Sequence, residues 1–91
     1  MADQVTDNPA RQRFELTVDG HTAFAAYALA DDVITFTHTV VPKELAGRGV
    51  GSTLARGALD NVRARHLKVI AECPFIAAYI AKHAEFADLL A

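Results

Sequence analysis

Apolar and polar residues alternate along much of the first half of the chain. In FELTV, residues 14–18, every second residue is apolar, which predicts a strand with one buried face. Asp19-Gly20 predicts a tight hairpin turn, and residues 22–29 predict a second, alanine-rich strand. Residues 33–41, VITFTHTVV, predict the strongest strand, because β-branched and aromatic residues favour a sheet. We therefore expect a three-stranded antiparallel meander that ends at Pro42.

The second half of the chain changes to a helical period. One apolar face predicts a helix over residues 51–65, formed by Leu54, Ala55, Ala58, Leu59 and Val62. His66 takes the position after this helix where a left-handed residue is common. Residues 67–73, LKVIAEC, predict a short strand, and Pro74 suits the first turn of another helix. The pattern leaves open whether AEFADLL, residues 84–90, is a short helix or an extended cap.

The predicted order β-β-β-α-β-α indicates one α+β domain over residues 13–91. A helical crossover joins parallel neighbours, so we expect the strands at 33–41 and 67–73 to pair in parallel within a mixed sheet. Residues 1–12 are polar and contain Asn8-Pro9, which predicts a flexible tail.

Composition and charge exclude several classes of protein. The chain is 52% hydrophobic and 22% charged, which is typical of a globular domain. Its net charge of −2 gives no basic footprint for nucleic acid. A single cysteine excludes an intrachain disulfide, and no spacing of His, Asp or Glu suggests a metal site. Because the chain has no long apolar run and no apolar signal core, we expect a cytoplasmic protein that does not bind membranes. We also expect a monomer or weak dimer.

A glycine cluster, GRGVG at residues 47–51, lies between the strongest strand and the first helix. Such a loop presents several backbone N–H groups at the positive end of a helix dipole, which favours binding of a phosphate. Ser52 adds a hydroxyl donor. The alternative is a tight turn without a ligand. No lysine follows Gly51, which excludes a nucleoside triphosphate loop, and too few residues follow it for a dinucleotide domain.

At this loop the sequence resembles the GNAT superfamily of acetyl-CoA-dependent N-acetyltransferases. Residues 46–51 match the signature Gln/Arg-x-x-Gly-x-Gly/Ala except at its first position, where this sequence has Ala46. Together with THT-VVP, GRGVGS and CPF-xxxYI-xxH, the chain over residues 14–90 resembles the minimal, short single-domain members.

This resemblance implies a GNAT-like fold with a cleft where two parallel strands splay, and acetyl-CoA as the co-substrate. The pantetheine arm would follow the backbone of Thr39, Val40 and Val41. The pyrophosphate would lie on the N–H groups of the loop, formed by Gly47, Arg48, Gly49, Val50, Gly51 and Ser52.

Two residues are candidates for the chemistry of acetyl transfer, which needs a deprotonated amine aligned with a polarised thioester. His38 has an unperturbed pKa of about 6.5, which suits a general base, although a strand histidine can equally be satisfied by a neighbour. Cys73 precedes Pro74 at a helix start, which favours the thiolate, although a lone cysteine is often a small buried apolar residue. The resemblance places both residues at the cleft.

Other polar residues are weaker candidates. Many GNAT enzymes use a tyrosine as an acid toward the leaving thiolate, but Tyr79 also fits the apolar face of its helix, and we expect it to pack. Glu72 is either a base acting through water or a solvated carboxylate, and His83 is expected to be structural or on the surface.

The sequence therefore predicts a small N-acetyltransferase that moves acetyl from acetyl-CoA to an amine. His38 would act as the base, with Cys73 assisting or carrying the acetyl group transiently. The acceptor, whether a protein lysine, a polyamine or a small metabolite, is left open. The alternative is an acyl-CoA-binding or adaptor module with little turnover, since the chain is short for a substrate-binding lid.

Overall fold

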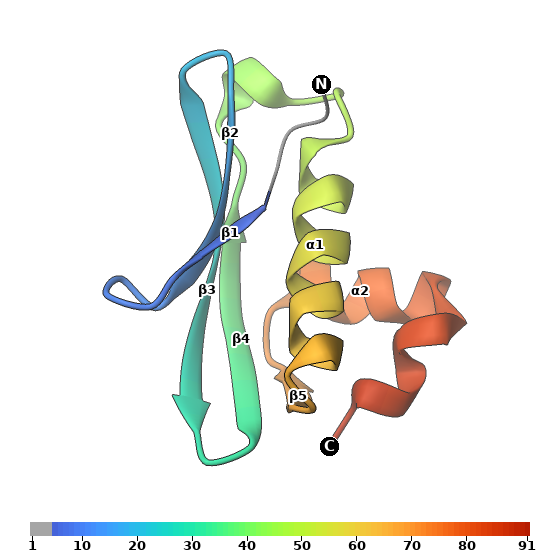
Figure 1. Cartoon of the computed structure of the whole chain (residues 1–91). Coiled ribbons are helices and arrows are strands. Elements are labelled where there is room, and N and C mark those ends of the chain that lie inside the picture. Colours follow the sequence, from blue (N-terminus) through green and yellow to red (C-terminus); the bar gives the residue numbers. More distant parts are fainter. Residues whose placement is uncertain (1–4) are drawn as a thin grey trace.

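The fold is one five-stranded sheet with α1, α2 and the C-terminal segment on one face (Figure 1). The structure is a computed structural model that describes residues 5–91. Its strands are β1 (Thr6–Asn8), β2 (Arg13–Val18), β3 (His21–Ala30), β4 (Val33–Val40) and β5 (Lys68–Ala71). Its helices are α1 (Val50–Ala64), α2 (Pro74–Lys82) and two 3-10 helices, η1 (Lys43–Leu45) and η2 (Ala84–Leu89).

The sheet has the order β1-β2-β3-β4-β5, so every strand pairs with its neighbour in sequence. The first four strands are antiparallel, and β4 and β5 are parallel, which confirms the expected mixed sheet. Asp19 and Gly20 both have positive φ, 51° and 78°, in the turn between β2 and β3. Left-handed residues at both central positions match the right-handed twist of a two-residue hairpin.

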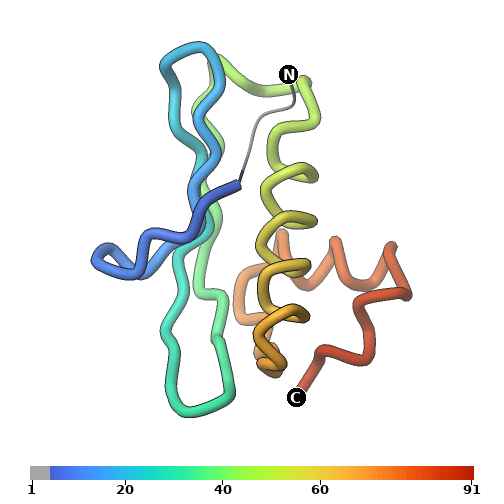
Figure 2. Tube along the Cα trace, in the orientation of Figure 1, coloured from blue at the N-terminus to red at the C-terminus, as the bar shows by residue number. Residues whose placement is uncertain are grey.

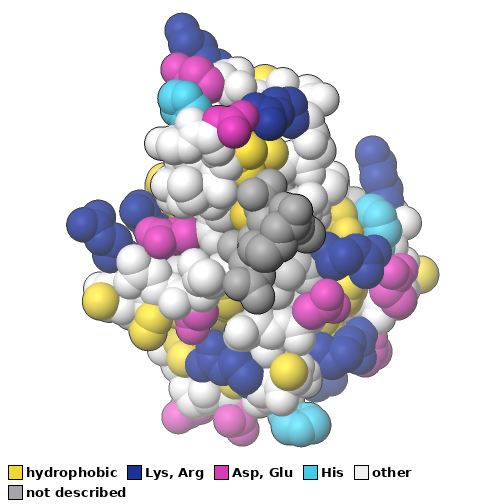
Figure 3. Space-filling model, turned by 45° about the horizontal axis from the view of Figure 1, so that its top comes forward, with side chains coloured by type: hydrophobic (Ala, Val, Ile, Leu, Met, Phe, Trp, Pro, Cys, Tyr) yellow, Lys and Arg dark blue, Asp and Glu magenta, His cyan; other side chains and the backbone are white. Residues whose placement is uncertain are grey.

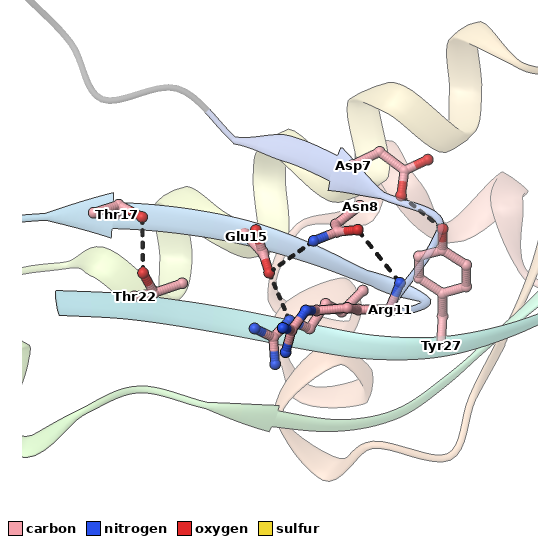
Figure 4. Close-up of polar contacts among 8 residues, drawn as sticks. Asp7, Asn8, Arg11, Glu15, Thr17, Thr22 and Tyr27 are labelled. Atoms are coloured by element: carbon pink, nitrogen blue, oxygen red, sulfur yellow. Dashed lines mark hydrogen bonds and ion pairs between the residues drawn. The ribbon is translucent and has the colours of Figure 1, made fainter.

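The expected flexible tail is wrong for Thr6–Asn8, which form β1. This strand pairs with the outer edge of β2, and the Asp7 carboxylate accepts a hydrogen bond of 2.6 Å from the Tyr27 hydroxyl (Figure 4). A three-residue strand has too short a pattern to show a period, and the Tyr27 hydroxyl that holds Asp7 lies 20 positions along the chain. Residues 1–4, which belong to the same expectation, lie outside the described residues.

The hydrophobic core lies between one face of the sheet and the two α-helices. All five residues of the predicted apolar face of α1 have an exposed fraction of 0%. They pack against the sheet side chains of Phe14, Leu16, Ile34 and Phe36, which are buried too. Figure 2 shows α2 and η2 beside α1 on the same side, so the opposite face of the sheet carries no described helix.

A β-bulge interrupts β4 at Thr37. In the register with β3, Tyr27 lies opposite Phe36 while Ala26 lies opposite His38, so Thr37 is the extra residue. A bulge reverses which face the following side chains take. Thr39 therefore joins the core side, and His38 turns to the open side, where its ring packs against Phe24 at 5.9 Å.

The C-terminal segment combines both structures that the sequence left open. Residues Ala84–Leu89 form η2, and Leu90 then makes a parallel bridge with Val69 at the free edge of β5. His66 has a φ of 57°, which confirms the expected left-handed residue after α1.

Candidate active site

The glycine loop has the backbone that its sequence predicts. Gly47 and Gly49 have φ of 78° and 72°, and a Cβ built on either would meet no atom within 4 Å. Glycine is thus required there by conformation, and the space in front of the loop is open. Gly51 has a different reason, because its Cβ would lie 2.9 Å from Cζ of the Phe75 ring. The close contact places the first turn of α1 against the first turn of α2.

The first turn of α1 has unused hydrogen-bond donors. The first helical bond runs from the Thr53 N–H to the Gly49 carbonyl at 3.0 Å, so the N–H groups of Val50, Gly51 and Ser52 have no helical acceptor. No side chain caps this end, and no acidic residue lies in the turn. The chemistry of these donors fits a phosphate, because the helix dipole adds partial positive charge.

Arg48 differs from its neighbours in the loop. Its N–H donates to the Leu45 carbonyl at 3.3 Å, and its guanidinium pairs with Asp19 at 2.8 Å. The backbone donor of Arg48 is thus already used, and its side chain ties the loop to the β2–β3 turn.

The parallel strands separate beside Cys73. The last residue pair is Phe36 with Ala71, after which the N–H groups of Glu72 and Cys73 both donate to the Phe36 carbonyl, at 3.0 and 2.9 Å. The chain then enters α2, while β4 continues to Val40 with β3 as its neighbour. Beyond Phe36, the other edge of β4 has no strand partner among residues 5–91.

Cys73 lies on the core side of this separation. Its side chain is 2% exposed, and its Sγ lies 3.2 Å from Oγ1 of Thr39. The two residues are 34 positions apart, so only the β4 bulge and the parallel pairing bring them together. The family resemblance implied a role only for the backbone of Thr39, and no local pattern indicated this side-chain contact.

His38 lies on the open face and is exposed. Its Nδ1 is 3.3 Å from Oγ1 of Thr37, and its other neighbour is the ring of Phe24, with the Arg13 guanidinium 4.4 Å from that ring's centroid. Arg13 also pairs with Glu15 at 2.6 Å and, by this hydrogen bond, holds the pKa of the Glu15 carboxyl below its usual value. The structure thus does not bring the His38 and Cys73 side chains into contact.

The remaining candidates occupy α2 and its approach. Tyr79 is 6% exposed and belongs to the core, which confirms its expected packing, and its ring stacks on His83 at 3.9 Å. Glu72 is exposed at the end of β5. Phe75, which is 40% exposed, and Lys82 were not singled out from the sequence, because each also fits an ordinary helix surface.

Charged side chains of both signs alternate over the surface that Figure 3 shows. Over residues 5–91, no helix combines the length and apolar character needed to cross a bilayer. Within the same range, no three His, Cys, Asp or Glu side chains gather in a group able to hold a metal ion.

Comparison with known proteins places this geometry in a family. No curated protein sequence matches the chain. The NMR solution structure of a GCN5-like protein from Staphylococcus aureus, named as a candidate N-acetyltransferase, is similar at 27% identity with a TM-score of 0.73. The match covers 97% of this chain and 87% of that one. A profile described as GCN5-related N-acetyl-transferase matches residues 13–89. The chain therefore belongs to the GCN5-related N-acetyltransferase family.

Proposed function

We propose that this protein transfers acetyl from acetyl-CoA to an amine. One observation carries the proposal: the first turns of α1 and α2 lie against each other at the point where β4 and β5 separate. The unused donors of α1, the unpaired edge of β4 and Cys73 therefore lie at one end of the β4–β5 pair, and we infer that they border one opening for the ligand. These groups match, in order, the pyrophosphate, the amide-bearing pantetheine arm and the thioester of acetyl-CoA.

Coenzyme A would bind along this opening through backbone groups. The pyrophosphate would accept hydrogen bonds from the N–H groups of Gly47 and residues 49–52, with Arg48 holding the loop in place. The pantetheine arm carries two amides, and these would pair with the backbone of residues 39–41. Backbone recognition explains why the loop can function with Ala46 at the first signature position.

The direct reaction uses His38 as the base. The ammonium form of the acceptor gives one proton to His38, and the neutral amine then attacks the thioester carbonyl. The C–S bond breaks as the amide bond forms, and the nitrogen releases its second proton to solvent. The departing CoA thiolate takes a proton, for which the Cys73 thiol is the nearest candidate donor, and solvent reprotonates Cys73. His38 faces the open side of the sheet, so the acceptor would approach from that side and the thioester from the helix side.

The covalent variant uses Cys73 as a carrier. The Cys73 thiolate attacks the thioester carbonyl, and CoA leaves as the thiolate, which takes a proton from solvent. The amine, deprotonated by His38, then attacks the acetyl group on Cys73; the Cys73 thiolate is released and the nitrogen loses its remaining proton to solvent. Thr39 lies 3.2 Å from the sulfur and can donate a hydrogen bond to the thiolate. Such a bond favours the charged form of the nucleophile.

Release of CoA thiol from acetyl-CoA with a panel of amines tests the proposal. We expect turnover in the wild type and a loss of about 10²-fold or more in His38→Ala, the usual range for removal of a general base. An acetyl adduct on Cys73, together with no release of CoA thiol in Cys73→Ala, would support the covalent variant. Partial activity in Cys73→Ala would select direct transfer. Tight CoA binding without release for any amine would instead support the binding-module alternative, and no CoA binding would refute both.

A further inference from the structure

The bulge residue of β4 lies beside the proposed base. In a regular strand, the side chains of adjacent residues take opposite faces of the sheet. Because Thr37 is the extra residue opposite β3, its side chain shares the open face with His38, and its Oγ1 lies 3.3 Å from Nδ1 of the His38 ring. The bulge thus creates a side-chain contact between two sequence neighbours that a regular strand does not allow.

The hydrogen of the Thr37 hydroxyl has a defined acceptor. Oγ1 of Thr37 donates to the carbonyl oxygen of Ala26 on β3 at 3.3 Å, and a carbonyl oxygen only accepts hydrogen bonds. A hydroxyl has one hydrogen and two lone pairs. Because its hydrogen is directed to Ala26, Thr37 can only accept from His38, so Nδ1 of the imidazole carries the proton.

This assignment decides which nitrogen of His38 is basic. In a neutral ring with the proton on Nδ1, Nε2 holds the free lone pair. The His38 side chain is exposed, and Nε2 has no hydrogen-bond partner among residues 5–91. Nε2 is therefore the ring atom that is available to an amine.

Phe24 restrains the same ring from β3. The two ring centroids are 5.9 Å apart, and the ring planes meet at 80°. Phe24 is itself held, because the Arg13 guanidinium lies 4.4 Å from the centre of its ring and pairs with Glu15. The His38 ring is thus restrained twice, by an aromatic contact and by the hydrogen bond at Nδ1.

We propose that Thr37 is a positioning residue for the base: it holds the His38 ring as the Nδ1–H tautomer and leaves Nε2 to accept the proton of the acceptor amine. The inference rests on the proposed function and names the atom that acts in it. When Nε2 takes the proton, Nδ1–H still donates to Oγ1 of Thr37, and the positive charge of the ring strengthens that hydrogen bond. Thr37 acts through His38 and supplies no reacting atom.

Nuclear magnetic resonance of the ring nitrogens tests the tautomer without any reaction. At about pH 8.5, where histidine rings are neutral, long-range proton–nitrogen correlation spectra distinguish a protonated from an unprotonated ring nitrogen. We expect the proton on Nδ1 of His38 in the wild type and in Thr37→Ser, which keeps the hydroxyl. Thr37→Val removes the hydroxyl at similar shape, so its His38 should shift toward the Nε2–H form. A proton on Nε2 in the wild type, or the wild-type spectrum in Thr37→Val, overturns the inference.

Turnover measures what the tautomer contributes. At saturating acetyl-CoA, release of CoA thiol should fall about 5-fold in Thr37→Val, the equivalent of about one hydrogen bond, and recover in Thr37→Ser. CoA affinity should stay unchanged in both. Thr35→Val, which removes a hydroxyl from the open face of the same strand, is the matched control and should alter neither the tautomer nor turnover.

The outcomes separate this inference from the proposed function. Equal turnover of Thr37→Val and the wild type overturns the positioning role while leaving His38 as the base. No release of CoA thiol by the wild type with any amine overturns the proposed function itself. The spectrum of the wild type needs neither a variant nor a substrate, so it tests the Thr37 contact in either case.

Discussion

The two ends of α1 differ in whether the protein itself satisfies their hydrogen-bonding groups. At the N-terminal end, three N–H groups lack acceptors, no side chain caps the turn, and the space in front is open. At the C-terminal end, the Leu67 N–H bonds the Val62 carbonyl, and Arg63 donates two hydrogen bonds to the Asp88 carboxylate. The second end is satisfied by the protein and stabilises the fold, whereas the donors of the first end remain available to the proposed phosphate.

Further ion pairs stabilise the body of α1 and its C-terminal end, which we call the tied end, whereas the Arg48–Asp19 pair lies beside the first turn, the open end. Asp7 joins the Tyr27 hydroxyl to the Arg65 guanidinium, which connects β1, β3 and the end of α1. Arg56 and Glu85 likewise tie α1 to η2. Substitutions at the tied end should therefore change stability without changing CoA affinity, and substitutions at the open end should lower CoA affinity.

Gly49→Glu should have the largest effect, because it places a carboxylate where the phosphate would lie. We expect CoA affinity to fall by about 100-fold or more, since juxtaposed like charges cost several kcal/mol. Gly49→Ala is the matched control: it carries the same left-handed strain, about 1–2 kcal/mol, without the charge. Calorimetric CoA titration and urea unfolding measure the two effects separately. Equal CoA affinities in the two variants would sink the phosphate-site assignment.

Tyr27→Phe should weaken the tied end without affecting CoA. Loss of the hydrogen bond to Asp7 should cost about 1 kcal/mol at pH 7. Burial, helped by Asp7, raises the pKa of Tyr27 to about 12, whereas an unfolded tyrosine titrates near pH 10. The protonated phenol is favoured by folding, so its contribution is complete below pH 10 and is lost as pH rises through 12, by roughly 2–3 kcal/mol.

Urea unfolding from pH 7 to 11 measures this dependence. The wild type should lose stability above pH 10 more steeply than Tyr27→Phe, because the variant lacks the titrating group. Parallel curves for the two proteins would contradict the assignment of the alkaline loss to Tyr27.

His66→Gly should stabilise the protein slightly. His66 holds a φ of 57° at the end of α1, where glycine has no steric penalty. We expect the free energy of unfolding to rise by about 0.5–1 kcal/mol, with unchanged CoA affinity. A fall in stability would show that the His66 side chain contributes contacts beyond its backbone conformation.

Arg63→Ala should have the smallest effect, confined to stability and acid pH. The hydrogen bonds from Arg63 hold the pKa of the Asp88 carboxyl below its usual value. A lowered carboxyl pKa contributes stability above the unfolded pKa of about 3.9, and this is lost as pH falls through the folded value. Thermal unfolding from pH 7 to 3 should therefore show a shallower acid loss in the variant. If stability falls with pH at the same slope in the wild type and the variant at low salt, the Arg63–Asp88 pair does not stabilise the tied end.

Much of the fold could be predicted because its signals are local. The alternation in residues 14–18, the density of β-branched residues in 33–41 and the single apolar face of α1 each act over a few positions. The GRGVG spacing likewise predicted a loop that presents free backbone N–H groups at the start of a helix, and only the structure showed that Gly47 and Gly49 are left-handed. Thr6–Asn8 could not be predicted, because three residues show no period and the Tyr27 hydroxyl that holds Asp7 lies 20 positions away.

The candidate site divides in the same way. By itself, the sequence determined the glycine loop, the order of strands and α-helices from residue 13 onward and the family resemblance, since these depend on residue types at fixed short spacings. Only the tertiary structure decided that Thr37 is a bulge, that His38 and Thr39 therefore take opposite faces, and that Thr39 meets Cys73 across 34 positions. The physical reason is strand register: one inserted residue reverses every later side chain, and only the pairing of β4 with β3 fixes where it is inserted.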